Sequence, residues 1–131
     1  MRHPAVAALL GLLIGYLVVM GIETLAHFLF PVSVLLTPEN LEAYMDQIPI
    51  GSKLMVILAH LLGGFVAVFT TLKLAKKRLP GYIIGALFLA FTVMNLVMIP
   101  HPVWFAIADV LLVVAGIAAA IKLVKIDQGE Q

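Results

Sequence analysis

Four long runs of apolar residues dominate the chain, and short polar segments separate them. The runs cover residues 4–30, 54–74, 82–99 and 103–123. A membrane-spanning helix needs about 20 apolar residues, because each residue adds about 1.5 Å along the helix axis. None of the runs shows the alternation of apolar and polar positions that a half-exposed helix or strand has. The pattern therefore predicts four transmembrane helices in a single membrane domain, residues 1–131.

Proline marks the ends of these runs. Pro31 follows the first run, Pro80 lies between the second and third, and Pro100 and Pro102 lie between the third and fourth. Proline has no backbone N–H and clashes with the preceding turn, so it favours helix ends over helix interiors. We therefore expect the helices to begin or end near these positions, with residues 31–53 forming the one long connection.

The long connection contains the signals of a short helix over residues 38–48. Thr37 is suited to cap its start, and Pro38 suits the first helical position. Four apolar residues then recur at helical spacing, while the acidic residues lie off that face: Leu41, Tyr44, Met45 and Ile48 against Glu39, Glu42 and Asp46. This arrangement predicts an amphipathic helix that lies at the membrane surface.

Composition limits the class of protein. Hydrophobic residues make up 63% of the chain and charged residues 11%, whereas a soluble domain is about 45–50% apolar and about 25% charged. A soluble enzyme, a nucleic-acid binder and a disordered chain are excluded, and the expected partner is the lipid bilayer. The chain has no cysteine, so it has no disulfide and no thiolate metal site. The expected fold class is all-α: an integral membrane four-helix bundle with a short amphipathic helix in the first outer loop.

The basic residues indicate the orientation of the helices. Of the eight lysines and arginines, only Lys53 lies at the end of the helices that carries the acidic loop; the others lie at the opposite end: Arg2, Lys73, Lys76, Lys77, Arg78, Lys122 and Lys125. Loops rich in lysine and arginine remain in the cytoplasm. We expect both termini and the 76–78 turn to be cytoplasmic, and the acidic loop and the 100–102 turn to face outward.

Six polar residues lie within or beside the predicted membrane helices: Glu23, His27, His60, Asn95, His101 and Asp109. An ionisable side chain in the bilayer is energetically costly, so each is a candidate for function. Counted from the outer helix ends, Glu23, His60, Asn95 and Asp109 lie within about a turn and a half of one another in depth. The sequence therefore predicts one outward-facing ligand- or proton-binding site.

Small residues share helix faces with these polar groups. In the second run, His60 begins a stripe that continues through glycine, alanine and threonine, and Gly11 and Gly15 form a small face in the first run. Small residues let membrane helices approach closely, so the polar groups are expected to point into the bundle. The same faces also suit a homodimer.

Three functions are compatible with the polar layer. It could bind a small solute, a proton or a cation for transport, since a carboxylate beside histidine can exchange protons. It could instead hold the helices in register in a structural or accessory subunit, with Glu23 paired to His60 and Asp109 paired to Asn95 or His101. It could also bind a divalent transition metal in a metal-binding protein or metalloenzyme, with five candidate ligands: Glu23, His27, His60, His101 and Asp109.

No sequence motif assigns a cofactor or an enzymatic reaction. Ser33 and Ser52, the only serines, lack the context of a nucleophile, and Gly63-Gly64 lies inside a predicted helix rather than in a phosphate-binding loop. The metal hypothesis also lacks the repeated Glu-x-x-His spacing of di-iron helical bundles. The sequence therefore favours a non-enzymatic role.

Residues 95–105, Asn-Leu-Val-Met-Ile-Pro-His-Pro-Val-Trp-Phe, carry a resemblance to a known group. Together with a first-helix Glu, a following proline and an acidic outer loop, they resemble small bacterial four-helix membrane proteins of unassigned function. The most specific element is the outer-turn pattern Pro-His-Pro-x-Trp-Phe, residues 100–105. The resemblance covers most of the chain and implies the four-helix architecture and a bacterial inner membrane, but no activity.

Overall fold

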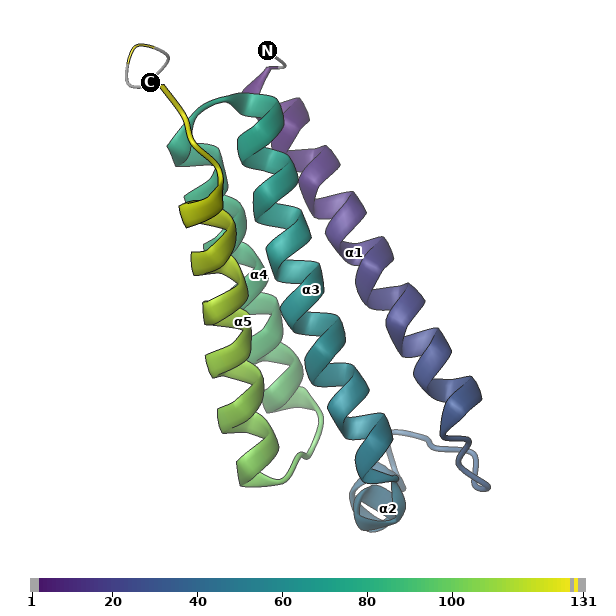
Figure 1. Cartoon of the computed structure of the whole chain (residues 1–131). Coiled ribbons are helices and arrows are strands. Elements are labelled where there is room, and N and C mark those ends of the chain that lie inside the picture. The colour runs from purple at the N-terminus through teal and green to yellow at the C-terminus, as the bar shows by residue number, and fades with distance from the viewer. Residues whose placement is uncertain (1–2, 128, 130–131) are drawn as a thin grey trace.

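A computed structural model describes residues 3–127 and 129, and these form a bundle of four long helices (Figure 1). The long helices are α1 (Pro4–Leu29), α3 (Ile50–Ala75), α4 (Arg78–Met98) and α5 (Val103–Leu123). All four are long and apolar enough to cross a membrane. Within the described ranges there is no β-strand. The predicted all-α four-helix fold, suited to a membrane, is confirmed.

Helix α3 lies at the centre of the bundle. It packs against α1 on one side and against α5 on the other, and α4 also lies against it (Figure 1). Among the described residues α1 and α5 have no direct contact. Helix α4 packs on both α3 and α5 but touches α1 only lightly. A side chain of α3, which packs closely on both α1 and α5, is therefore well placed to link them.

Glycines allow α1 to lie very close to α3. A Cβ atom added at Gly15 would stand 2.6 Å from the Cβ of Ala67 and 2.7 Å from the carbonyl oxygen of Gly63. A Cβ added at Gly11 would stand 2.5 Å from the Ala67 carbonyl oxygen. The small face of α1 expected from the sequence is thus used inside the chain.

The turn between α3 and α4 lies at Lys76-Lys77, within the predicted 76–78 turn, but α4 begins before Pro80 rather than after it. Lys76 caps α3 in the left-handed conformation, with φ 52°. Lys77 is extended, and α4 begins at Arg78. Pro80 therefore lies in the first turn of α4, where proline is tolerated because the backbone N–H groups there have no partner within the helix. At the other end, α3 begins at Ile50, earlier than the apolar run alone indicates.

The surface helix is shorter than residues 38–48. It consists of α2 (Leu41–Tyr44) followed by a 3₁₀ turn, η1 (Met45–Gln47). The side-chain oxygen of Asn40 accepts a hydrogen bond from the Thr37 backbone N–H at 2.8 Å. Residues 38–40 form a turn that leads directly into α2, so the regular helix begins three residues later than predicted. The predicted amphipathic face is present: Met45 is buried, and the other three apolar residues are partly buried, while the acidic residues are exposed.

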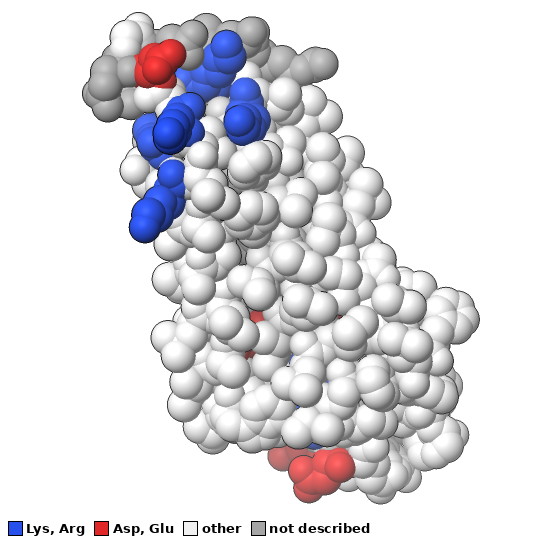
Figure 2. All heavy atoms as spheres, viewed as in Figure 1, with Lys and Arg blue, Asp and Glu red and all other residues white. Residues whose placement is uncertain are grey.

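Charged residues separate to the two ends of the bundle. Most lysines and arginines gather at the end where α1 begins and α5 ends, where Asp127 also lies near Lys125, and the acidic residues of the loop mark the opposite end (Figure 2). Arg2, which belongs to the predicted basic group, lies outside the described residues. At the basic end Arg78 donates a hydrogen bond to the Ile121 carbonyl in the last turn of α5. A cation is favourable there because helix C-termini carry partial negative charge.

Candidate functional site

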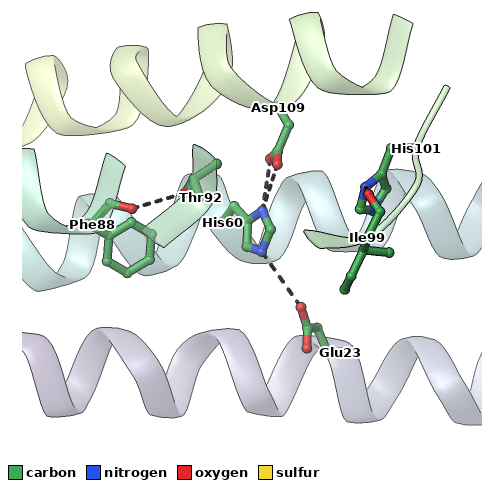
Figure 3. Close-up of polar contacts among 7 residues, drawn as sticks. All are labelled: Glu23, His60, Phe88, Thr92, Ile99, His101 and Asp109. Atoms are coloured by element: carbon green, nitrogen blue, oxygen red, sulfur yellow. Dashed lines mark hydrogen bonds and ion pairs between the residues drawn. The ribbon is translucent and has the colours of Figure 1, made fainter. Parts of the chain in front are cut away.

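Three of the predicted polar residues meet near the acidic end of the bundle. Glu23 comes from α1, His60 from α3 and Asp109 from α5, and His60 lies between the two carboxylates (Figure 3). Glu23 lies six residues before the end of α1, and Asp109 lies six residues after the start of α5. At the helical rise both are roughly 9 Å from their helix ends, so they lie at the same depth. We call these three residues the carboxylate–histidine cluster.

The His60–Asp109 contact is the tight half of the cluster. The Nδ1 atom of His60 lies 2.9 Å from each carboxylate oxygen of Asp109. Asp109 is 0% exposed and His60 only 7%. A carboxylate so deeply buried requires a hydrogen-bond donor, and the Nδ1–H of His60 is the donor in place. This bond commits Nδ1 to Asp109 and directs Nε2 toward α1 (Figure 3).

The His60–Glu23 contact is the loose half. Oε1 of Glu23 lies 3.8 Å from Nε2 of His60, which is within the range of an ion pair but longer than a hydrogen bond. The Glu23 side chain is 38% exposed. Glu23 is therefore near enough to respond to the charge of His60, yet its carboxylate keeps room for another partner.

Glu23 faces a groove between α1 and α4. The groove has a volume of about 760 Å³, and Glu23 and His60 are the acidic and histidine residues among its lining. The rest of the lining is mostly apolar and comes mainly from α1 and α4, with aromatic and methionine side chains that include Tyr16, Met20, Phe88, Phe91, Met94 and Met98. The groove exists because α1 and α4 both pack on α3 while making little contact with each other.

Asn95 lies on the groove, apart from the carboxylate–histidine cluster. It belongs to α4 and lines the groove, as does Thr92 one turn earlier. The Thr92 hydroxyl donates to the Phe88 carbonyl oxygen at 3.1 Å, so it is engaged within its own helix. Asn95 makes no side-chain hydrogen bond with the described part of the chain. Its amide is thus a second polar group available to an occupant of the groove.

His27 and His101 do not join the cluster. His27 is exposed in the last turn of α1. The Nδ1–H of His101 donates to the Ile99 carbonyl oxygen at 2.7 Å, and its ring stacks on Phe105 with 4.4 Å between centroids. The expected pairing of Asp109 with Asn95 or His101 is therefore wrong: Asp109 pairs with His60, because α3 lies directly against α5 at this depth.

The cluster does not have the geometry of a metal site. Among residues 3–127 and 129, no group of three or more His, Asp or Glu side chains is arranged to hold a metal ion. The physical reason is visible in Figure 3: the two carboxylates lie on opposite sides of the His60 ring and do not converge on one point. The five proposed metal ligands include His27 and His101, which lie outside the cluster.

The residues of the groove, apart from its polar members, were not anticipated from the sequence. Their signal is a helical spacing: Leu9, Leu12, Tyr16, Val19 and Glu23 recur every three or four residues on α1. The matching stripe on α4 runs from Phe88 to Asn95. Reading these two stripes as facing walls would have located the groove.

The charges of the cluster do not balance by themselves. Two carboxylates flank one imidazole, so when both are ionised a net negative charge remains even with His60 protonated. In surroundings of low dielectric such a charge is costly unless it is neutralised. A proton on Glu23 removes this net charge, and a bound cation beside Glu23 also removes it.

No protein-family model, curated protein or solved structure matches this chain.

Proposed function

We propose that the protein is a multi-pass membrane transporter that binds a small solute at Glu23 in exchange with a proton. The single observation that supports this most strongly is the pair of carboxylates on either side of one imidazole, with Glu23 at the wall of a groove of about 760 Å³. A purely structural network has no need of a carboxylate that lies 3.8 Å from its partner and faces open space.

The two halves of the cluster have different tasks in this proposal. Asp109 holds the His60 ring in one orientation and balances its charge when Nε2 is protonated. His60 therefore presents Nε2 to Glu23 in a fixed direction. Protonation of Glu23 weakens its attraction to His60, and ionisation strengthens it. Since Glu23 is on α1 and His60 on α3, exchange at Glu23 changes the force between these two helices.

The proposed orientation places the site in the outer half of a bacterial inner membrane, with both termini in the cytoplasm. Its support is the cluster of basic residues at the end of the bundle opposite the acidic loop (Figure 2). Five of these basic residues lie in the first or last turn of a membrane helix or follow it directly: Lys73, Lys76, Arg78, Lys122 and Lys125. Such an excess of positive charge favours the cytoplasmic side.

The proposal is tested by thermal unfolding of the purified full chain between pH 5 and 8, alone and with a panel of small solutes and salts. Binding to the folded state raises the melting temperature by mass action. Wild type should show a pH- or ligand-dependent shift that Glu23→Gln removes. The matched control is Glu42→Gln, the same substitution at an exposed acid of α2. Equal profiles for wild type and Glu23→Gln would contradict the proposal.

A structural role is the second candidate, and the buried His60–Asp109 pair favours it. This pair joins α3 to α5 at a point where Asp109 is fully enclosed. If the whole cluster served only to join helices, Glu23→Gln would lower the melting temperature by an amount that no added solute changes. The experiment above separates this outcome from solute binding.

A further inference from the structure

We propose that the groove binds an organic cation, with its charged group beside Glu23 and its apolar body along the walls formed by α1 and α4. This inference rests on the proposed function and names the class of solute. It follows from three features of the groove: the sign of its charge, the scarcity of oxygen ligands, and the nature of its walls.

The sign of the charge selects a cation. No lysine or arginine lines the groove, and its carboxylate is Glu23. The positive charge that His60 can carry is shared with Asp109, whose two oxygens both lie 2.9 Å from Nδ1. An anionic solute would add to the unbalanced charge, whereas a cation would cancel it. If a cation and a proton were both held at Glu23, the cluster would carry a net positive charge. The cation and the proton therefore compete for Glu23.

The scarcity of oxygen ligands excludes a small inorganic cation as the preferred occupant. A metal ion such as Ca²⁺ needs six to eight oxygen ligands, and Mg²⁺ needs an octahedral set. The side-chain oxygens that line the groove belong to Glu23, Asn95, Thr92 and Tyr16, fewer than such a metal ion needs, and no group of three or more His, Asp or Glu side chains in the described ranges is arranged to hold a metal. A quaternary ammonium or phosphonium group has no N–H donor and is weakly hydrated, so it can bind through charge and apolar contact without a set of oxygen ligands.

The walls suit the apolar body of such a solute. Tyr16, Phe88 and Phe91 provide aromatic rings, and Met20 and Met94 provide flexible thioethers. Aromatic faces attract organic cations, and methionine adapts to irregular shapes. The volume of about 760 Å³ lies within the range of pockets for drug-sized ligands, about 300–1,000 Å³.

The groove is reached from the side of the bundle. Tyr16, Met20, Phe91 and Met94 are lining residues whose side chains are also exposed on the outside of the bundle. In a membrane this outside faces lipid tails. A solute that partitions into the bilayer can therefore reach Glu23 without crossing the polar loops. A lipid acyl chain is the competing occupant of the groove. It differs from an organic cation because its binding does not require the negative charge of Glu23.

Two ions of the same shape and opposite charge test the proposal. The full chain in a non-ionic detergent is titrated with tetraphenylphosphonium and, separately, with tetraphenylborate, and empty micelles are subtracted. We expect wild type to bind the phosphonium at least tenfold more tightly than the borate. Glu23→Gln should weaken phosphonium binding at least tenfold, while Glu42→Gln should leave it unchanged.

Further variants keep the test decisive if Glu23→Gln fails to fold. Glu23→Asp retains the charge and should retain binding. Met94→Trp fills the groove without touching the charge and should weaken binding, whereas Leu111→Trp, on the exposed face of α5, should not. Equal binding of the two ions, or binding insensitive to Glu23 and Met94, would show an apolar slot for lipid and overturn the proposal.

Failure of this inference is distinguishable from failure of the proposed function. The pH-dependent unfolding of wild type and Glu23→Gln requires no organic ion. If the melting temperatures of wild type and Glu23→Gln depend differently on pH and tetraphenylphosphonium does not bind, the class of solute is wrong and the proton-exchanging site stands. If that difference is absent and no solute gives a Glu23-dependent shift, both proposals are wrong.

Discussion

The Nδ1 atom of His60 lies 2.9 Å from both carboxylate oxygens of Asp109, although 49 positions separate the two residues in the chain. The contact joins α3 to α5, and Asp109 has no exposed surface. It also determines which nitrogen of His60 faces Glu23. One buried pair thus supports the fold and orients the group that the proposed exchange site depends on.

Removing Asp109 should destabilise the bundle strongly. Asp109→Ala leaves His60 buried without its acceptor, and breaking a buried pair in this way costs about 3–5 kcal/mol. The free energy of unfolding can be measured by titration with SDS in mixed micelles. The double variant His60→Leu/Asp109→Leu should lose less than Asp109→Ala, because it leaves no unpaired polar group. An Asp109→Ala protein as stable as wild type would contradict this account of the pair.

Gly15 and Gly21 on α1 should differ in their tolerance of alanine. A Cβ at Gly15 would overlap Ala67 and the Gly63 carbonyl, whereas a Cβ at Gly21 meets nothing within 4 Å. Gly15→Ala must shift α1 away from α3, and overpacking of this kind costs about 1–3 kcal/mol. Gly21→Ala should leave the free energy of unfolding unchanged or slightly higher. Equal effects of the two variants in the SDS titration would argue against the close packing of α1 on α3.

Single cysteines should report the orientation of the helices. The natural chain has no cysteine, so an introduced one is the sole site for a maleimide. Glu42→Cys, in α2, should react with a membrane-impermeant maleimide added to intact spheroplasts. Lys125→Cys, which follows α5, should react only after permeabilisation. The reverse pattern would place the basic end outside and the carboxylate–histidine cluster in the inner half of the membrane.

His101 should make the stability of the outer turn depend on pH. Partial burial lowers the pKa of His101 from its usual 6.5, and this outweighs the opposing effect of its bond to the Ile99 carbonyl. The folded state therefore favours the neutral ring, so the stabilisation is present above about pH 6.5 and is lost as the pH falls through the lower folded-state pKa. The difference in melting temperature between wild type and His101→Gln should be larger at pH 8 than at pH 5. A difference that grows on acidification would contradict this sign.

The number of helices and the layer of polar residues could be predicted from the sequence. Length and hydropathy determine how many helices can span a bilayer, and counting from helix ends correctly placed Glu23, His60 and Asp109 at one depth. The turn at residues 76–78 was also predicted, but the start of α4 at Arg78, before Pro80, was not. Proline is disfavoured in the interior of a helix, but the first turn of a helix tolerates it. Pro80 lies in such a first turn, so its position alone did not locate the start of α4.

The partners within the layer could not be predicted. Depth along the membrane follows from counting residues, but the pairing of side chains depends on which helix lies at the centre, and that is decided by packing. Because α3 separates α1 from α5, His60 meets both carboxylates and Asn95 is directed to the groove. The groove itself arises from the weak contact between α1 and α4, which depends on how both helices pack on α3.

Release of protons on binding tests the central claim, the competition of proton and cation at Glu23, most directly. The full chain in weakly buffered detergent solution is titrated with tetraphenylphosphonium at several values between pH 5 and 8, and the pH change is recorded. Wild type should release protons as the cation binds, with a release that approaches one per site as the pH falls and Glu23 becomes protonated beforehand. Glu23→Gln should release none. Binding of the cation to wild type with no proton release at any pH would contradict the account.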